Sequence, residues 1–354
     1  MSRFLNERVS ALKPYTPGEQ PKGREYIKLN TNESPYPPSP LAIKAASEAA
    51  ERLMLYPDPD CTELLLSVAA DLGVSQNQLI LTNGSDEVLN FAFMAYCDEK
   101  TPAVFADITY GFYKVFADLN GISKKEIPLG EDFSLNIDDY IKTPGTVFIA
   151  NPNAPTGLYL PLSEIERLLS SNRERVVVID EAYVDFGSES AVSLIDKYDN
   201  LLVTRTFSKS RSMAGARLGF GVASPQIISD LMRIKYSTNP YNVNRMTAAA
   251  GIGSVADTEY FEKNCREIIE TRERTKSELA TLGFELTNSQ ANFIFAKHAR
   301  VGGEELYLAL KERGVLVRHF SGERISEYNR ITVGSPSEMR VLVDTVKSIL
   351  EEKL

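Results

Sequence analysis

The chain of 354 residues contains no tryptophan, only two histidines and only three cysteines. The cysteines, Cys61, Cys97 and Cys265, lie far apart, without the CxxC or Cys/His spacing of disulfide frameworks and zinc sites. We therefore predict no disulfide and no metal site, and we interpret the three cysteines as buried apolar groups.

Long hydrophobic runs are also missing. No apolar segment approaches the roughly 20 residues that cross a bilayer, and residues 1–10 lack the apolar core of a signal peptide. A formal net charge of −9 is unlike the clustered positive charge that binds nucleic acid. We therefore expect a cytoplasmic protein whose partners are small molecules, with no nucleic acid and no membrane among them.

The pattern up to residue 256 predicts an α/β domain. Strand candidates such as residues 176–179 are continuously apolar, which is typical of parallel strands that helices cover on both faces. Amphipathic segments alternate with them, and Ser39-Pro40 suits the start of a helix. We predict a large domain with a mostly parallel central sheet and helices on both faces. The strands are expected at residues 79–82, 103–106, 146–150, 176–180, 201–206 and 218–223, and helices at 86–97, 110–119, 162–170 and 225–236.

After residue 257 the pattern changes to a long helical stretch, followed by short strand candidates near residues 292–296, 315–318 and 330–333. Ser335 and Glu338 form a capping box that opens a final helix. We predict an N-terminal arm at residues 1–28 that joins the small domain, a large domain at residues 29–256 and a small α+β domain at residues 257–354.

Lys209 follows an apolar strand, at the edge of an open α/β sheet where ligands bind. A lysine in such a place can form a Schiff base with an aldehyde cofactor. Thr206, Ser208 and Arg217 lie nearby in the sequence and offer hydroxyls and a planar guanidinium that suit a phosphate group. The alternative is a surface lysine in a serine-rich loop, and this segment alone leaves both readings open.

Asp180 ends a second apolar strand. Burying a carboxylate is costly unless it has a cationic partner, and a protonated pyridine nitrogen would be such a partner. Tyr183, three residues later, is able to donate to a phenolic oxygen of the same cofactor. An acidic pair after a strand is also a common helix cap, so this segment too has a structural alternative.

A third segment runs from a strand through Asn83-Gly84 into a helix that begins near Ser85 and Asp86. Free amide groups at a helix N-terminus bind phosphate, and Gly84 permits a close approach. Turns of this kind are common, so the segment is weak evidence by itself. It matches neither the Walker loop nor the dinucleotide-binding fingerprint.

Together the three segments resemble those of the fold-type I enzymes that use pyridoxal 5′-phosphate (PLP), specifically the class I and II aminotransferases. The resemblance covers nearly the whole chain. Residues 151–157, Asn-Pro-Asn-Ala-Pro-Thr-Gly, match the family's Asn-Pro-x-x-Pro-Thr-Gly stretch. Residues 180–183 and 208–219 match its two cofactor segments. The resemblance implies PLP bound to Lys209, with Asp180 at the ring nitrogen and Lys209, Asp180 and Tyr183 in catalytic roles.

The same resemblance implies the remaining cofactor contacts. Backbone amides of Ser85 and Asp86 would hold the phosphate, together with Thr206, Ser208 and Arg217. Tyr110 would stack on the pyridine ring. A homodimer with active sites at its interface is implied as well, with Tyr56 reaching the phosphate from the neighbouring subunit.

Residues 12–15, 29–34, 56–58 and 330–334 are similar to the histidinol-phosphate aminotransferases, a branch of the family. This similarity implies transamination of L-histidinol phosphate with 2-oxoglutarate, in histidine biosynthesis. Arg330 would bind the carboxylate of glutamate, and further substrate contacts are expected from Arg318, Tyr15 and Asn32. Aromatic-amino-acid aminotransferases and threonine-phosphate decarboxylases share the cofactor motifs and stay open as alternatives. A PLP-binding transcription regulator fits less well, because it would need a basic DNA-binding domain ahead of residue 39.

One position departs from the family pattern. Many relatives carry asparagine immediately before Pro155, where its amide helps to hold the phenolic oxygen of the cofactor, but this chain has Ala154. Either Tyr183 holds the oxygen alone, or a water or Asn153 takes the place of the missing amide. We expect an altered pKa of the lysine–cofactor imine, with the function retained.

Overall fold

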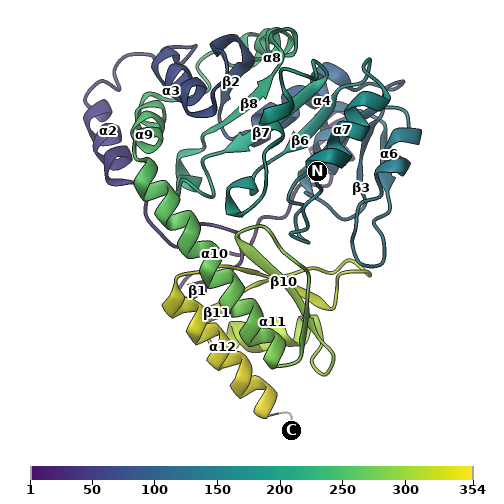
Figure 1. Ribbon diagram of the computed structural model, residues 1–354, viewed down its shortest axis with the longest axis vertical. Helices are drawn as coiled ribbons and strands as arrows, with labels where there is room; N and C mark the ends of the chain where they lie inside the picture. Colours follow the sequence, from purple (N-terminus) through teal and green to yellow (C-terminus); the bar gives the residue numbers. More distant parts are fainter. Residues whose placement is uncertain (1, 353–354) are drawn as a thin grey trace.

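The computed structural model describes residues 2–352. Met1 and residues 353–354, the outermost parts of the predicted arm and small domain, lie outside the described residues. Figure 1 shows a larger unit built on a central sheet and a smaller unit, with the long helix α10 (Thr258–Thr281) running from one into the other. Among residues 2–352, no helix combines the length and apolar character that crossing a bilayer requires.

The central sheet has seven strands in the order β2-β8-β7-β6-β5-β3-β4. β8 is antiparallel to both of its neighbours, and the other pairings are parallel. The predicted fold class, a mostly parallel sheet in an α/β unit, is therefore confirmed. The strands are β2 (Leu79–Thr82), β3 (Ala103–Ala106), β4 (Lys124–Ile127), β5 (Thr146–Ala150), β6 (Val177–Asp180), β7 (Leu201–Thr206) and β8 (Gly219–Ala223).

Helices cover both faces of this sheet. Successive side chains of a strand point to opposite faces, so Val177 and Ile179 of β6 join one hydrophobic cluster while Val178 joins another. The first cluster includes side chains of α3 and α7, and the second includes side chains of α4, α5 and α8. The helices of this unit are α2 (Pro40–Ala50), α3 (Thr62–Leu72), α4 (Ser85–Tyr96), α5 (Phe112–Asn120), α6 (Ile137–Lys142), α7 (Leu162–Ser171), α8 (Pro225–Thr238) and α9 (Arg245–Ala256).

The smaller unit contains a four-stranded antiparallel sheet, in the order β12-β13-β10-β9, with α10 and two further helices around its own core. Near the N-terminus, β1 (Ile27–Lys28) pairs in parallel with β11 (Val315–Leu316) of this unit. That pairing supports the predicted arm, whereas the exact domain boundaries stay a prediction. The remaining elements are α1 (Glu7–Ser10), β9 (Phe284–Leu286), β10 (Phe293–His298), α11 (Gly303–Glu312), β12 (Arg318–His319), β13 (Tyr328–Thr332) and α12 (Pro336–Glu351).

Several elements were not predicted from the sequence, among them α3, α9, α11 and β4. Helix α9 lacks an amphipathic pattern because small residues let it pack closely on α2: a Cβ at Gly253 would lie 2.5 Å from the carbonyl oxygen of Leu41. Strand β4 is largely exposed and begins Lys-Lys-Glu, so no apolar pattern marks it. The predicted start of α2 is confirmed, since the Ser39 side chain accepts a hydrogen bond from the backbone of Ala42.

Candidate active site

A cavity of ≈ 410 Å³ opens at the carboxyl ends of three neighbouring parallel strands of the central sheet. Ala150 ends β5, Asp180 ends β6 and Thr206 ends β7, and all three line the cavity. This is the edge at which open α/β sheets bind ligands. A second cavity of ≈ 670 Å³ adjoins it and shares Tyr110, Ala154, Tyr183 and Lys209 as lining residues. The two cavities therefore form one site with an inner and an outer part.

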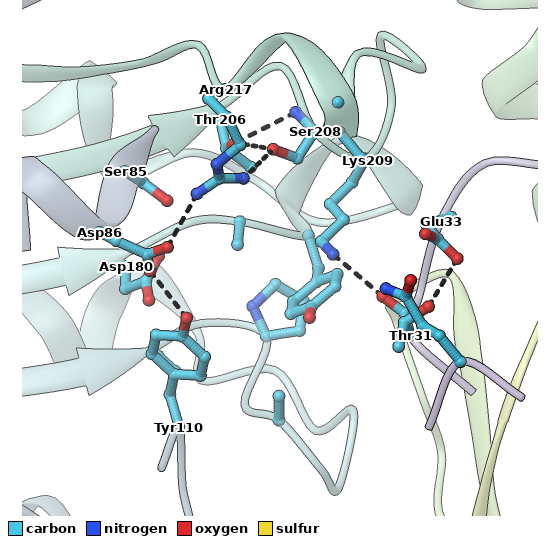
Figure 2. Close-up of a pocket in the computed structure, with 18 residues that line it drawn as sticks. Thr31, Glu33, Ser85, Asp86, Tyr110, Asp180, Thr206, Ser208, Lys209 and Arg217 are labelled. Carbon is cyan, nitrogen blue, oxygen red and sulfur yellow. Dashed lines mark hydrogen bonds and ion pairs between the residues drawn. The ribbon is translucent and has the colours of Figure 1, made fainter. Parts of the chain in front are cut away.

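Lys209 projects into the inner cavity from the turn after β7 (Figure 2). Its Nζ lies 3.4 Å from the carbonyl oxygen of Thr31, which belongs to the segment after β1. Burial lowers the pKa of the Lys209 ammonium to about 8, and the positive charge of Arg330 acts in the same direction while Glu33 opposes it. A lysine with a lowered pKa is partly uncharged near neutral pH, which is the form that attacks an aldehyde.

Asp180 occupies another side of the inner cavity and is 5% exposed. One carboxylate oxygen accepts a hydrogen bond from the hydroxyl of Tyr113 at 3.1 Å, and the other accepts from Thr204 at 3.2 Å. Burial raises the pKa of Asp180 to about 6, although these two hydrogen bonds oppose the rise. A buried carboxylate of this kind is suited to pair with a cation inside the cavity.

The third part of the inner cavity suits an anion. Helix α4 begins at Ser85, and its first backbone amides have no partners within the helix. Opposite it, Thr206 and Ser208 share a hydrogen bond of 3.0 Å, and Arg217 lies 3.5 Å from the Ser208 hydroxyl. Gly219 is required here, because a Cβ would lie 2.3 Å from the amide nitrogen of Ser85.

Two carboxylate contacts complete this end of the cavity, as Figure 2 shows. Asp86 forms an ion pair with Arg217 at 3.0 Å and accepts a hydrogen bond from the hydroxyl of Tyr110 at 2.7 Å. The arrangement thus combines an amine, a buried carboxylate, an aromatic ring and an anion site around one cavity. These are the groups that match the aldehyde, ring nitrogen, ring face and phosphate of PLP.

The outer cavity contains the predicted substrate residues. Arg330 donates to the carbonyl oxygen of Asn30 at 3.0 Å, and its guanidinium lies 5.4 Å from the ring centre of Phe293. Arg318 and Tyr15 line the same cavity. Burial lowers the pKa of the Arg330 guanidinium from its ordinary high value. Two arginines thus face a space next to Lys209, and such guanidiniums suit carboxylates and phosphates.

Comparison with known proteins agrees with this geometry. A family model described as aminotransferase class I and II matches residues 24–346. The chain belongs to the class I and II aminotransferases. It is 48% identical over 351 residues to the histidinol-phosphate aminotransferase of Clostridium acetobutylicum, covering 99% of this chain and 100% of the relative. It is 49% identical to that of a Marinomonas species, with the same coverage. The family predicted from the sequence is therefore confirmed.

A solved structure supports the fold of this aminotransferase. The crystal structure of the histidinol-phosphate aminotransferase of Sinorhizobium meliloti, in complex with pyridoxal-5′-phosphate, aligns with a TM-score of 0.87. The alignment covers 99% of each chain at 22% sequence identity, so it is evidence for the fold alone.

Tyr56 lies apart from the other predicted cofactor residues of this aminotransferase. Its side chain is 80% exposed, stacks on Tyr241 with ring centres 4.8 Å apart, and lines neither of the two cavities. A role for Tyr56 at the phosphate therefore requires a second subunit.

The contacts of Asn153 exclude it as a substitute for the amide that is missing at Ala154. Both donor contacts of the Asn153 side chain go to protein groups, the carbonyl oxygen of Ile108 at 3.0 Å and the hydroxyl of Thr156 at 3.1 Å. Asn153 therefore does not replace the missing amide. Ala154 itself lines both cavities and offers no side-chain donor there.

Some residues of the site were not identified from the sequence. Thr31 and Glu33 line the inner cavity, and Arg324 and Lys114 line the outer one. Thr31 and Glu33 flank Asn32, which was predicted to lie at the substrate site, so their neighbour was an available indication. Tyr113 had one available indication, since it lies three residues after Tyr110, within the helix that the sequence predicted at residues 110–119.

Proposed function

We propose that this aminotransferase uses PLP to exchange an amino group between L-histidinol phosphate and 2-oxoglutarate, a step of histidine biosynthesis. The observation that carries the proposal is the pair of arginines, Arg318 and Arg330, lining the cavity next to Lys209. The names of relatives at 48% and 49% identity support the same substrate. The cofactor follows from the match between its four chemical groups and the four parts of the inner cavity.

When bound, PLP supplies an aldehyde that reacts with amines and a ring that accepts electron density. Lys209 would hold the aldehyde through its Nζ, and the same amine is placed to move a proton to and from the substrate Cα. Asp180 would keep a proton on the ring nitrogen, which makes the ring a better electron acceptor. Tyr183 would donate to the phenolic oxygen, and the amide groups at the start of α4 would bind the phosphate together with Arg217.

The two substrates place different anions in the outer cavity. Glutamate presents an α-carboxylate, for which the fork of Arg330 is suited. Histidinol phosphate has no carboxylate, so its phosphate must occupy similar space next to Lys209. A phosphate has more oxygens and more negative charge, and Arg318 with Tyr15 supplies the additional donors.

The active form in this proposal is a homodimer located in the cytoplasm. Four consecutive apolar residues, at positions 53–56, are each more than half exposed, with Met54 and Tyr56 both 80% exposed. Exposed apolar clusters of this kind are typical of protein interfaces. A partner covering this segment would bring Tyr56 toward a neighbouring active site.

The proposal is tested by an absorbance spectrum of the purified protein with PLP, followed by initial rates with histidinol phosphate, phenylalanine and threonine phosphate. We expect a visible band that changes when histidinol phosphate is added, and the highest kcat/KM for that amine. Lys209→Ala should lose the band shift, whereas the surface variant Lys197→Ala should keep it. Faster turnover of phenylalanine would contradict the proposed substrate and favour an aromatic-amino-acid aminotransferase. Release of CO₂ from threonine phosphate would contradict it in favour of a decarboxylase.

A further inference from the structure

The side chain of Asn32 is closely bound within the protein although it lies at the edge of the active site. It is 1% exposed, and its Nδ2 donates a hydrogen bond of 3.0 Å to the hydroxyl oxygen of Tyr183. Its Oδ1 accepts from the Thr332 hydroxyl at 3.1 Å, and the same hydroxyl accepts from the Asn32 backbone amide at 2.9 Å. Asn32 thus connects the segment after β1 to Tyr183, which follows β6.

The backbone keeps Asn32 in place. Its φ of 55° lies in the left-handed region, which asparagine tolerates better than most residues. Its carbonyl oxygen accepts a hydrogen bond of 3.1 Å from Asn292, itself fully buried. The side-chain amide therefore has one well-determined orientation, with Nδ2 toward Tyr183 and Oδ1 toward Thr332.

This orientation fixes the direction of the hydrogen bond between Asn32 and Tyr183, and with it the role of the hydroxyl hydrogen of Tyr183. An amide NH₂ group donates and does not accept, so the Tyr183 oxygen is the acceptor of that bond. Among the hydrogen bonds of residues 2–352, none has Tyr183 as the donor, so its hydrogen is available to a group in the cavity. The ring itself is held by an edge-to-face contact with Phe293, with ring centres 5.1 Å apart.

We propose that Asn32 is a positioning residue that directs the Tyr183 hydrogen to the phenolic oxygen of the cofactor, in a chain where Ala154 supplies no second donor. The inference rests on the proposed use of PLP. Since Asn153 is engaged elsewhere, Tyr183 is the donor that this chain presents to that oxygen. Because Asn32 donates to the hydroxyl oxygen of Tyr183, the hydroxyl hydrogen of Tyr183 is left to donate to the phenolic oxygen.

The test follows the pH midpoint of the visible absorbance change of the PLP-loaded protein. Donors to the phenolic oxygen stabilise its negative charge, which lowers the proton affinity of the nearby lysine–cofactor nitrogen. Asn32→Gly removes the side chain and tolerates the left-handed backbone. We expect its midpoint to rise by about 0.5 pH unit or more. This is the size expected when the charge-assisted hydrogen bond from Tyr183 to the phenolic oxygen is weakened but not lost. Asn32→Asp, which offers Tyr183 an acceptor instead of a donor, should raise the midpoint further.

Two further variants distinguish this role from a general structural one. In a Tyr183→Phe background, Asn32→Gly should cause no additional shift. Ala154→Asn, which restores the amide, should lower the midpoint of the Asn32→Gly protein. The control Asn264→Ala removes a buried asparagine on α10 that lines neither cavity, and it should leave the midpoint unchanged.

An unchanged midpoint in Asn32→Gly and Asn32→Asp, or an equal shift with and without the Tyr183 hydroxyl, would overturn the inference. Should Asn32→Gly fail to fold, as judged by its unfolding temperature, the size-matched Asn32→Asp variant decides alone. The absence of any visible band in the unmodified protein would instead contradict the proposed cofactor, so the two failures are distinguishable.

Discussion

The hydroxyl of Tyr113 lies 3.1 Å from a carboxylate oxygen of Asp180, and both side chains are buried. The tyrosine comes from α5 and the aspartate from the end of β6, so the contact joins a helix on one face of the sheet to the edge where the cofactor site lies. Without a cation beside it, Asp180 is an unfavourable buried charge that two hydroxyls only partly relieve.

This relationship predicts a pH-dependent stability of the cofactor-free protein. Burial raises the pKa of Asp180 from 3.8 to about 6, so the folded state retains this proton to higher pH than the unfolded state. The stabilisation is fully present below pH 4 and is lost as the pH rises through about 6. Asp180→Asn cannot ionise, and above pH 7 it should be more stable than the parent by up to about 3 kcal/mol.

Urea unfolding of both proteins from pH 4 to pH 8 measures this difference. Glu181, whose pKa burial raises to about 7, contributes a similar trend in both proteins and cancels in the comparison. A difference in unfolding free energy that does not change with pH would contradict the assignment.

The two arginines of the outer cavity should affect the two substrates differently. Arg318→Ala should lower kcat/KM for histidinol phosphate by about 10- to 100-fold, since a hydrogen-bonded charge is lost from the phosphate. Its effect on glutamate should be smaller, whereas Arg330→Ala should impair both substrates. Steady-state kinetics with each amine provides the comparison. Equal losses for the two amines in Arg318→Ala would argue against a phosphate role.

Arg324 connects the smaller unit to the larger one at the outer cavity. Its guanidinium bonds to the Asp107 carboxylate at 2.8 Å and to the carbonyl oxygens of Leu129 and Gly130 at 2.9 and 2.6 Å. We expect Arg324→Ala to raise KM for both amines about tenfold, with little change in kcat, because the wall of the substrate cavity loosens. Arg324→Lys should be intermediate.

The matched control for this prediction is Arg313→Ala, which removes a surface arginine that is paired with Glu352 and is not among the residues lining the outer cavity. Its KM values should equal those of the unmodified protein. If both arginine variants behave alike, Arg324 has no special part in shaping the cavity.

Subunit complementation tests the place of Tyr56. Homodimers carrying Lys209→Ala should be inactive, and those carrying Tyr56→Ala should bind PLP about tenfold or more weakly through loss of a hydrogen bond to the phosphate. Random mixing of the two yields hybrid dimers with one intact site. At PLP concentrations too low to saturate Tyr56→Ala, we expect recovery to about a quarter of the parent activity. No recovery in verified hybrids would place Tyr56 outside the partner's site.

Much of the large unit was predictable because its strands carry their own signal. Strands β2, β3, β5 and β7 have the predicted bounds, and β6 and β8 differ by one residue. Strand β4 and helix α9 were missed for opposite reasons, since β4 is too polar and α9 has too little contrast between its faces. In both cases, contacts with neighbouring elements stabilise a structure that local pattern does not indicate.

Sequence alone was sufficient for the family, the fold class and many of the residues that line the inner cavity, because an amine, a carboxylate and an anion site lie in short segments after strands. Tertiary structure alone determined which groups hold the side chains of the site in position. Tyr113 donates a hydrogen bond to Asp180, 67 positions away in the sequence. Asn32 donates to Tyr183 across 151 positions, and Arg324 donates to Asp107 across 217. Hydrogen bonds between such distant residues depend on how the sheet, helices and arm pack, and no local pattern in the chain records that packing.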